Sequence, residues 1–224
     1  MPSPSQVRAV LFDLDGTLAD TAPDMSDSLN ELLMRHGRQT LDYQEVRKHT
    51  SRGGLALIKL GYNGTLDDDE TLQLRDEFLQ IYARRLHDKT RLFPGVLALL
   101  DHLDEAGLPW GIVTNKPGWL TEPLVEKLQL TPRASCTISG DSLPERKPRP
   151  EPLSKAADLL HVDPAECLYM GDDPRDIQAG KAASMKTAVA AYGYIQDHQD
   201  PHAWGADVVL EAALELKDWL SLHG

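Results

Sequence analysis

Four short segments of this 224-residue sequence carry side chains suited to work on a phosphorylated molecule. The first contains Asp13 and Asp15, two carboxylates separated by one residue, directly after an apolar run. Carboxylates are natural ligands of Mg²⁺, and a carboxylate beside a metal-bound phosphate can act as a nucleophile. Such pairs also occur in ordinary turns and calcium-like loops, so the interpretation depends on where the pair lies in the fold.

The second and third segments add groups that can bind phosphate. Thr114 and Asn115 can donate hydrogen bonds to phosphate oxygens, although the same pair also fits a helix cap. Lys147 lies among prolines, which stiffen the backbone around it. A fixed ammonium group can neutralise both a nucleophile and an incoming phosphate; the alternative is a solvated basic loop.

The fourth segment is an acidic cluster of Asp172, Asp173 and Asp176. Three carboxylates so close together repel one another, and a bound cation relieves the repulsion. Capping of the following helix explains one of the three and not the others. The four segments in this order therefore indicate a magnesium site and a phosphate site built together.

These segments lie near the ends of predicted strands. We predict strands at residues 7–12, 110–113, 134–139, 167–170, 186–190 and 207–210. We predict helices between and after them at residues 96–106, 119–128, 152–160, 174–183 and 212–220. This alternation predicts an α/β fold, a Rossmann-like doubly wound parallel sheet with helices on both faces. Ligands of such sheets bind beyond the carboxyl ends of the strands, which is where the four segments lie.

The pattern changes between about residue 20 and residue 87, where apolar residues recur at helical spacing and no strand is expected. We therefore predict an α/β core of residues 1–19 and 90–224 that holds the chemistry. Residues 20–89 form the predicted inserted helical cap, which would decide the substrate. Within it, Arg52 precedes two glycines and could contact an anionic group of the substrate. A solvated turn is the alternative interpretation of Arg52.

Composition and charge exclude some partners. A net charge of -12 disfavours nucleic acid and anionic membranes, and it requires local positive charge for an anionic substrate. Cys136 and Cys167 form no Cys-x-x-Cys pair, so we expect buried free thiols in a reducing compartment. The N-terminus lacks a signal-peptide pattern and no apolar run would span a bilayer, so we expect a cytoplasmic protein. Nothing in the sequence indicates an oligomeric state.

With these motifs in place, the sequence resembles the haloacid dehalogenase superfamily over essentially its whole length. The resemblance rests on four motifs, which are Asp13-Leu14-Asp15-Gly16-Thr17-Leu18, Thr114-Asn115, Lys147-Pro148 and Gly171-Asp172-Asp173-Pro174-Arg175-Asp176. The helical insert after the first motif is similar to the superfamily's cap of the first type. The resemblance therefore implies the haloacid dehalogenase fold and a phosphatase of small metabolites.

The resemblance also implies a role for each residue. Asp13 would attack phosphorus and become an aspartyl-phosphate, and Asp15 would protonate the leaving oxygen and then activate water. The phosphate would be bound by Gly16, Thr114, Asn115 and Lys147. Mg²⁺ would be held by Asp13, the backbone carbonyl of Asp15, and Asp172. Its waters would be oriented by Asp176, with Asp173 as a second candidate.

The acid at Asp15 favours phosphate chemistry, because the dehalogenases that name the superfamily lack an acid there. A sugar phosphomutase and a non-catalytic binding protein of the same fold stay as alternatives. The resemblance is closer to phosphoglycolate phosphatase-like proteins, among them the N-acetylmuramic acid 6-phosphate phosphatases. It is carried by residues 20–24, 113–117, 150–153, 192–195 and 204–209. This implies N-acetylmuramic acid 6-phosphate as the substrate, in cell-wall sugar recycling, with 2-phosphoglycolate as the alternative.

Two residues depart from the pattern of these proteins. Arg149 stands where an acidic residue is common, and Ser184 stands where glycine is usual. Neither belongs to the proposed chemistry. Ser184 would strain its turn if the backbone there requires a positive φ angle.

Overall fold

The structure is a computed structural model that describes residues 6–223, so residues 1–5 and residue 224 of the predicted core lie outside the described residues. Its main sheet has six parallel strands in the order β5-β4-β1-β6-β7-β8. The strands are β1 (Ala9–Phe12), β4 (Trp110–Val113), β5 (Cys136–Ile138), β6 (Cys167–Gly171), β7 (Lys186–Ala190) and β8 (Val208–Leu210). Every predicted strand is present, with ends shifted by two residues at most, and the α/β fold is confirmed.

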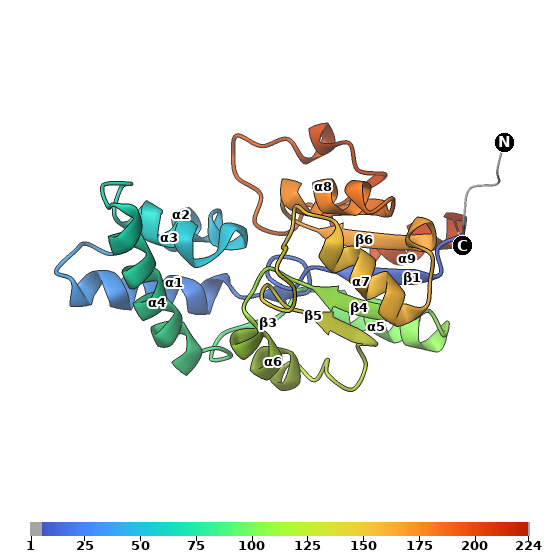
Figure 1. Cartoon of the computed structure of the whole chain (residues 1–224), viewed down its shortest axis with the longest axis horizontal. Coiled ribbons are helices and arrows are strands. Elements are labelled where there is room, and N and C mark those ends of the chain that lie inside the picture. The colour runs from blue at the N-terminus through green and yellow to red at the C-terminus, as the bar shows by residue number, and fades with distance from the viewer. Residues whose placement is uncertain (1–5, 224) are drawn as a thin grey trace.

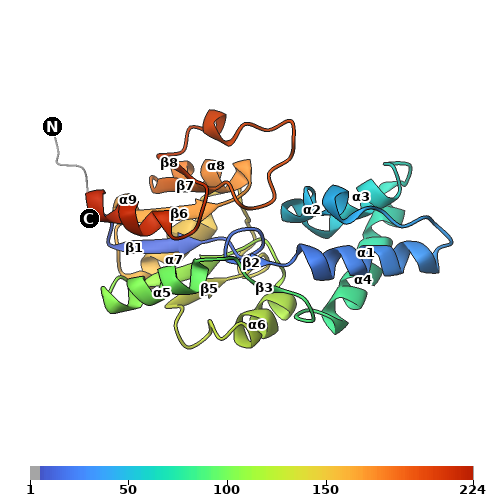
Figure 2. The same cartoon turned by 180° about the vertical axis from the view of Figure 1, so that it is seen from behind.

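Helices cover both faces of this sheet (Figures 1 and 2). They are α5 (Val96–Glu105), α6 (Gly118–Lys127), α7 (Glu151–Leu160), α8 (Pro174–Ala182) and α9 (Glu215–His223), with 3₁₀ turns at Pro164–Glu166 and Pro201–Trp204. In β1, Val10 and Phe12 pack in the core shared with α5, α6 and α9, whereas Ala9 and Leu11 pack in the core shared with α7 and α8. Successive strand residues face opposite sides, so an unbroken apolar run suits a strand buried on both faces.

A helical insert extends from the carboxyl-end side of the sheet, as Figures 1 and 2 both show. It contains α1 (Ala22–Arg35), α2 (Tyr43–Arg47), α3 (Gly53–Gly61) and α4 (Asp68–Arg84), with a 3₁₀ turn at Thr50–Arg52. The chain enters it through β2 (Ala19–Asp20) and leaves it through β3 (Arg91–Leu92), and these two short strands pair antiparallel. Sequence periodicity did not predict this pair, because two residues are too few to show alternation.

Hydrogen bonds fix the two crossings between the sheet and the helical insert. The Asp24 carboxylate accepts from the backbone N–H of Thr90 at 2.8 Å and from its hydroxyl at 2.7 Å. The Tyr194 hydroxyl accepts from the N–H of Ala22 at 2.9 Å and donates to Asp20 Oδ1 at 2.8 Å. The insert is therefore tied to the sheet by buried polar contacts at its base.

Ser184 occupies a left-handed position, with φ of +63°. It ends α8 in a Schellman motif, in which the N–H of Met185 donates to Gly180 and that of Ser184 to Lys181, both at 2.9 Å. A Cβ is disfavoured in this conformation, so Ser184→Gly should raise the free energy of unfolding by about 0.5–1 kcal/mol after the entropy cost of glycine. Thermal melting monitored by circular dichroism checks this.

The matched control is Ser154→Gly, which lies within helix α7 and should lower stability by about 0.5 kcal/mol. Phosphatase activity should be unchanged in both variants. A Ser184→Gly protein that melts at a lower temperature than the wild type contradicts the strain argument.

The two cysteines and the helix lengths can be compared with the sequence analysis. Cys136 and Cys167 are free and buried, and burial raises the pKa of each thiol to about 11. Such thiols are poor nucleophiles at neutral pH. None of the helices within residues 6–223 has the length and apolar character that a membrane crossing needs.

Candidate active site

The candidate site lies at the carboxyl ends of β1, β4 and β6, which are neighbours in the sheet. Asp13 follows β1, Thr114 follows β4 and Asp172 follows β6. The N–H of Asp13 donates to the carbonyl of Met170 at 2.9 Å, so β1 stays paired with β6 up to the carboxylate. The strand order therefore brings three of the four predicted segments together.

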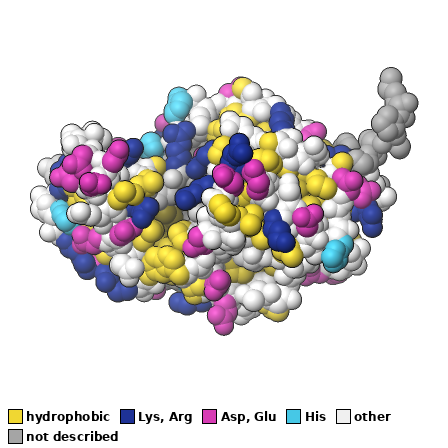
Figure 3. Space-filling model, viewed as in Figure 1, with side chains coloured by type: hydrophobic (Ala, Val, Ile, Leu, Met, Phe, Trp, Pro, Cys, Tyr) yellow, Lys and Arg dark blue, Asp and Glu magenta, His cyan; other side chains and the backbone are white. Residues whose placement is uncertain are grey.

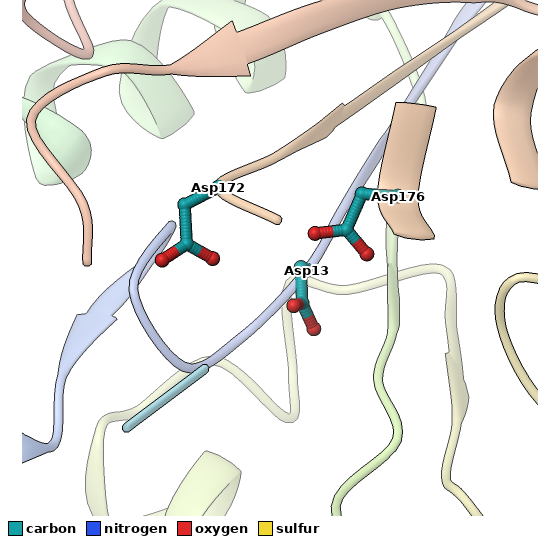
Figure 4. A group of neighbouring side chains, drawn as sticks. All are labelled: Asp13, Asp172 and Asp176. Carbon is teal, nitrogen blue, oxygen red and sulfur yellow. The ribbon is translucent and has the colours of Figure 1, made fainter. Parts of the chain in front are cut away.

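The side chains of Asp13, Asp172 and Asp176 converge on one space, as Figure 4 shows. One carboxylate oxygen from each lies within 4.8 Å of the others, and all three residues are buried. Asp172 Oδ2 accepts from Ser51 Oγ at 2.5 Å and from the N–H of Tyr194 at 2.9 Å. Asp172 Oδ1 is buried and has no hydrogen-bond partner among the described residues. A buried oxygen without a partner is costly, and a cation would satisfy it.

Burial and mutual repulsion change the acidity of this cluster. Burial raises the pKa of Asp13 to about 6; Lys147 opposes the rise, while Asp176 and Asp15 add to it. Burial, together with the charges of Asp13 and Asp176, raises the pKa of Asp172 well above its ordinary value. Without a cation, Asp13 and Asp172 therefore retain protons at pH values where isolated carboxylates would lose them.

Gly16 lets the first loop pass directly against Asp172. Its φ is +84°, and a Cβ there would lie 2.0 Å from Asp172 Oδ2. A Cβ at Gly193 would lie 2.4 Å from the carbonyl oxygen of Gly16. Both positions require glycine because a side chain would displace the Asp172 carboxylate or the loop. Gly16, predicted in the phosphate site, thus borders the carboxylate cluster.

Lys147 links Asp13 to the rest of the cluster. Its Nζ lies 3.0 Å from Asp13 Oδ1 and 2.8 Å from Asp176 Oδ1, and its side chain is only 2% exposed. It also donates to the Tyr169 hydroxyl at 2.7 Å, which in turn donates to the carbonyl of Val113. Burial acts to lower the pKa of Lys147, but the two carboxylates outweigh it and raise the pKa. The ammonium group therefore stays charged.

Thr114 and Asn115 take different positions in the site. Thr114 is buried and lines the cavity, and its hydroxyl accepts from the N–H of Lys116 at 3.2 Å, which leaves its proton to donate. The Asn115 amide pairs with the backbone of Lys147, donating to the carbonyl at 3.0 Å and accepting from the N–H at 3.1 Å. Asn115, predicted to bind phosphate, thus positions Lys147 and keeps one N–H for a ligand.

Asp15 is held by residues to which sequence reasoning assigned no role. Lys116 Nζ lies 3.0 Å from Asp15 Oδ1, and Thr21 Oγ1 donates to the same oxygen at 2.7 Å. Lys116 also donates to the hydroxyl of Tyr82, which comes from α4 of the helical insert, at 3.0 Å. The lysine directly after Thr114-Asn115 was a visible signal for Lys116. No local pattern indicates Tyr82.

Asp173 lies apart from the carboxylate cluster. Its carboxylate caps α8 by accepting from the N–H of Arg175 at 3.0 Å, and it pairs with Arg175 Nε at 2.8 Å. Burial acts to raise the pKa of Asp173, but Arg175 outweighs it and lowers the pKa. Arg175 also donates to the carbonyl of Ser51 in the helical insert at 2.9 Å. Asp176 and Asp173 were both candidates to orient the waters of the metal ion. Asp176 faces the space between the carboxylates, whereas Asp173 caps α8.

A cavity of about 610 Å³ opens beside these groups, between the helical insert and the sheet. Its walls include five acidic residues and six basic ones. The acidic residues are Asp13, Asp15, Asp76, Asp141 and Asp176, and the basic residues are Arg52, Arg75, Lys116, Arg146, Lys147 and Arg175. Figure 3 shows Lys and Arg side chains around the hollow between the two parts of the molecule. The local positive charge that an anionic substrate requires is thus present, although the net charge is -12.

Comparison with known proteins agrees with this fold. The family model described as haloacid dehalogenase-like hydrolase matches residues 10–190. The chain belongs to this family of hydrolases, and its relatives make it a phosphoric monoester hydrolase.

Two named relatives are similar over nearly the whole chain. N-acetylmuramic acid 6-phosphate phosphatase of Pseudomonas aeruginosa is 40% identical over 215 residues, which cover 96% of this chain and 95% of the relative. A phosphoglycolate phosphatase of Xanthomonas campestris is 42% identical over 209 residues, which cover 93% and 94%. A crystal structure described as a predicted phosphoglycolate phosphatase from Haemophilus somnus superposes with a TM-score of 0.86 at 25% identity, covering 97% and 99%.

Proposed function

We propose that the protein is a Mg²⁺-dependent phosphatase that hydrolyses a small phosphorylated metabolite through an aspartyl-phosphate on Asp13. The observation that carries this proposal is the buried group of Asp13, Asp172, Asp176 and Lys147, of which all but Asp172 line the cavity wall. A purely structural salt-bridge cluster would not be expected to leave the buried Oδ1 of Asp172 without a partner or to border a substrate-sized cavity.

The proposed reaction has two steps. In the first, an oxygen of Asp13 forms a bond to phosphorus, the ester P–O bond breaks, and Asp15 gives its proton to the leaving oxygen. In the second, Asp15 takes a proton from water, the water oxygen attacks phosphorus, and Asp13 is released. Lys147 offsets the negative charge on Asp13 and the phosphoryl oxygens throughout. Lys116 and Thr21 hold the Asp15 carboxylate in place.

The residues present fit a magnesium ion. Asp13 and Asp172 would ligate it together with the backbone carbonyl of Asp15, and Asp176 is close enough to contact the ion or its waters. When bound, Mg²⁺ supplies positive charge that stabilises the phosphoryl group in the transition state. The proposed ligands are all oxygen atoms, with no thiolate and no imidazole among them. Such a ligand set favours a hard cation such as Mg²⁺.

Magnesium should stabilise the protein more at pH 7.5 than at pH 5. At about 100 times its Kd, a ligand adds about 2.7 kcal/mol, which is roughly 5–10 °C in Tm for a chain of this size. The raised pKa of Asp13, about 6, means that the metal-free fold loses stability as pH rises from about 4 through 6. At pH 5 protons compete with the metal on Asp13.

Thermal melting with Mg²⁺ or with EDTA at the two pH values measures this difference. Asp172→Asn, which removes a ligand, should abolish most of the shift at pH 7.5. An equal magnesium shift at both pH values contradicts the assignment of Asp13 as a ligand.

Cavity size favours N-acetylmuramic acid 6-phosphate over 2-phosphoglycolate as the substrate. The nine or so heavy atoms of 2-phosphoglycolate, at about 30 Å³ each as an upper bound, fill less than half of the 610 Å³ cavity. A phosphorylated N-acetyl sugar acid has more than twice as many atoms. Both esters carry a carboxylate, for which Arg52 at the start of α3 is the proposed partner.

The test of the function compares kcat/KM on these two esters with Mg²⁺ present. We expect release of inorganic phosphate from both, with N-acetylmuramic acid 6-phosphate preferred by at least tenfold. A preference for 2-phosphoglycolate would make that ester the substrate. Formation of an isomer without net phosphate release would indicate a phosphomutase. No release from any of a broad panel of phosphate esters with Mg²⁺ present would indicate a non-catalytic binding protein.

The helical insert takes the role of a cap in this proposal. Residues 20–89 would form the substrate-selecting cap and residues 1–19 and 90–224 the catalytic core. Ser51 supports this division, because it reaches from the insert to Asp172. A cytoplasmic location is consistent with the two free thiols, and small phosphorylated substrates are the proposed partners rather than nucleic acid or membrane.

A further inference from the structure

Two large apolar side chains are exposed at the cavity. Trp119 is 45% exposed and Leu55 is 40% exposed, and both line the cavity wall. Trp119 comes from α6 beside the sheet, whereas Leu55 comes from α3 of the helical insert. Tryptophan is highly buried on average, so an indole exposed in a cavity indicates a surface that a ligand can cover.

The start of α6, which carries Trp119, is anchored by buried neighbours and by hydrogen bonds. Trp119 is followed by Leu120 and Thr121, which are 1% and 0% exposed. The Thr121 hydroxyl donates to the carbonyl of Lys116 at 3.0 Å. The N–H of Gly118 donates to Asp141 at 2.8 Å. The buried neighbours anchor α6 against the core. Trp119 therefore faces the cavity because of the orientation of the helix, and this orientation is fixed by packing.

The position of Trp119 suits the non-phosphate part of a substrate. It lies five residues after Thr114 along the chain, next to the loop that would hold the phosphate. The phosphate end of the site is lined by charged and polar groups of Asp13, Thr114 and Lys147. A short ester bound to these groups would not reach the apolar side chains of Trp119 and Leu55. A sugar ring presents an apolar C–H face of a size that an indole and a leucine can cover.

We infer that Trp119, with Leu55 from the helical insert, forms the binding surface for the ring of the substrate. Trp119 is then a specificity-determining residue that favours ring-bearing phosphate esters over short-chain esters. This inference rests on the proposed phosphatase function and deepens it, because it assigns the selection of substrate to a residue outside the predicted cap.

The experiment compares Trp119→Ala with the wild type on N-acetylmuramic acid 6-phosphate and on 2-phosphoglycolate. The variant should lose at least tenfold in kcat/KM on the sugar ester, mainly through KM, and less than threefold on the short ester. Trp119→Phe keeps an aromatic face and should recover most of the loss. The control is Leu159→Ala, an equally exposed apolar residue (46%) on α7 that does not line the cavity, and it should change neither value.

A second measurement separates this inference from the proposed function. Equilibrium binding of N-acetylmuramic acid 6-phosphate in EDTA should weaken at least fivefold in Trp119→Ala, whether or not the wild type hydrolyses the ester. Weakened binding without any hydrolysis by the wild type contradicts the phosphatase proposal and supports the inference. Equal binding, or an equal kinetic loss on both esters, overturns the inference.

Discussion

Asp13→Asn should lower phosphate release by at least about a thousandfold, because an amide oxygen does not attack phosphorus at a useful rate. The side chain keeps its shape, so the loss measures chemistry rather than packing. The measurement is release of inorganic phosphate from N-acetylmuramic acid 6-phosphate and from an aryl phosphate. The loss should be the same order of magnitude on both, because the nucleophile is common to all substrates.

The control for this variant is Asp158→Asn, an exposed aspartate on α7 outside the cavity, which should keep full activity. Far-UV circular dichroism should show the same helix content in both proteins. When the reaction with a ³²P-labelled ester is stopped with acid, the wild type should carry protein-bound ³²P on Asp13, because an acyl phosphate is stable in acid. The variant should carry no such label. Retained activity in Asp13→Asn would refute the nucleophile assignment.

Lys147→Met should lower both activity and stability. Activity should fall by about 10²–10³-fold, the usual cost of removing a group that stabilises developing charge. Stability should fall by about 3–5 kcal/mol at pH 7.5 in EDTA, because Asp13 and Asp176 would lose their buried cationic partner. Methionine has a similar length, so little of this loss comes from packing. Urea unfolding measures the stability term.

The pH dependence tests the cause of that loss. The stability difference between wild type and Lys147→Met should shrink at pH 5, where Asp13, with a pKa of about 6 even beside the lysine, takes up a proton. Lys155→Ala, an exposed lysine on α7, should lose neither activity nor stability. A Lys147→Met protein as stable as the wild type at pH 7.5 would show that the buried ion pairs contribute little.

Much of the fold could be predicted because its signals are local. The buried strands β1 and β6 are short apolar runs that end at acidic residues, and helices begin and end at recognisable residues between them. The strand pair of β2 and β3 could not be predicted, since it joins two residues from each side of a 70-residue helical stretch. The last helix begins at Glu215, later than expected, because the segment from Ala212 forms turns instead.

The groups that the proposed chemistry needs can be identified from residue type and position: the acidic pair after the first strand, the Thr-Asn pair, the lysine and the second acidic cluster. Which of these groups contact one another follows only from the folded arrangement of the chain. It turned Asp176 toward Asp13 and Asp173 toward Arg175, and it set Lys116 against Asp15 and Tyr82. The physical reason is that a side chain's role follows from its partners, and these partners come from strands and helices far apart in the chain.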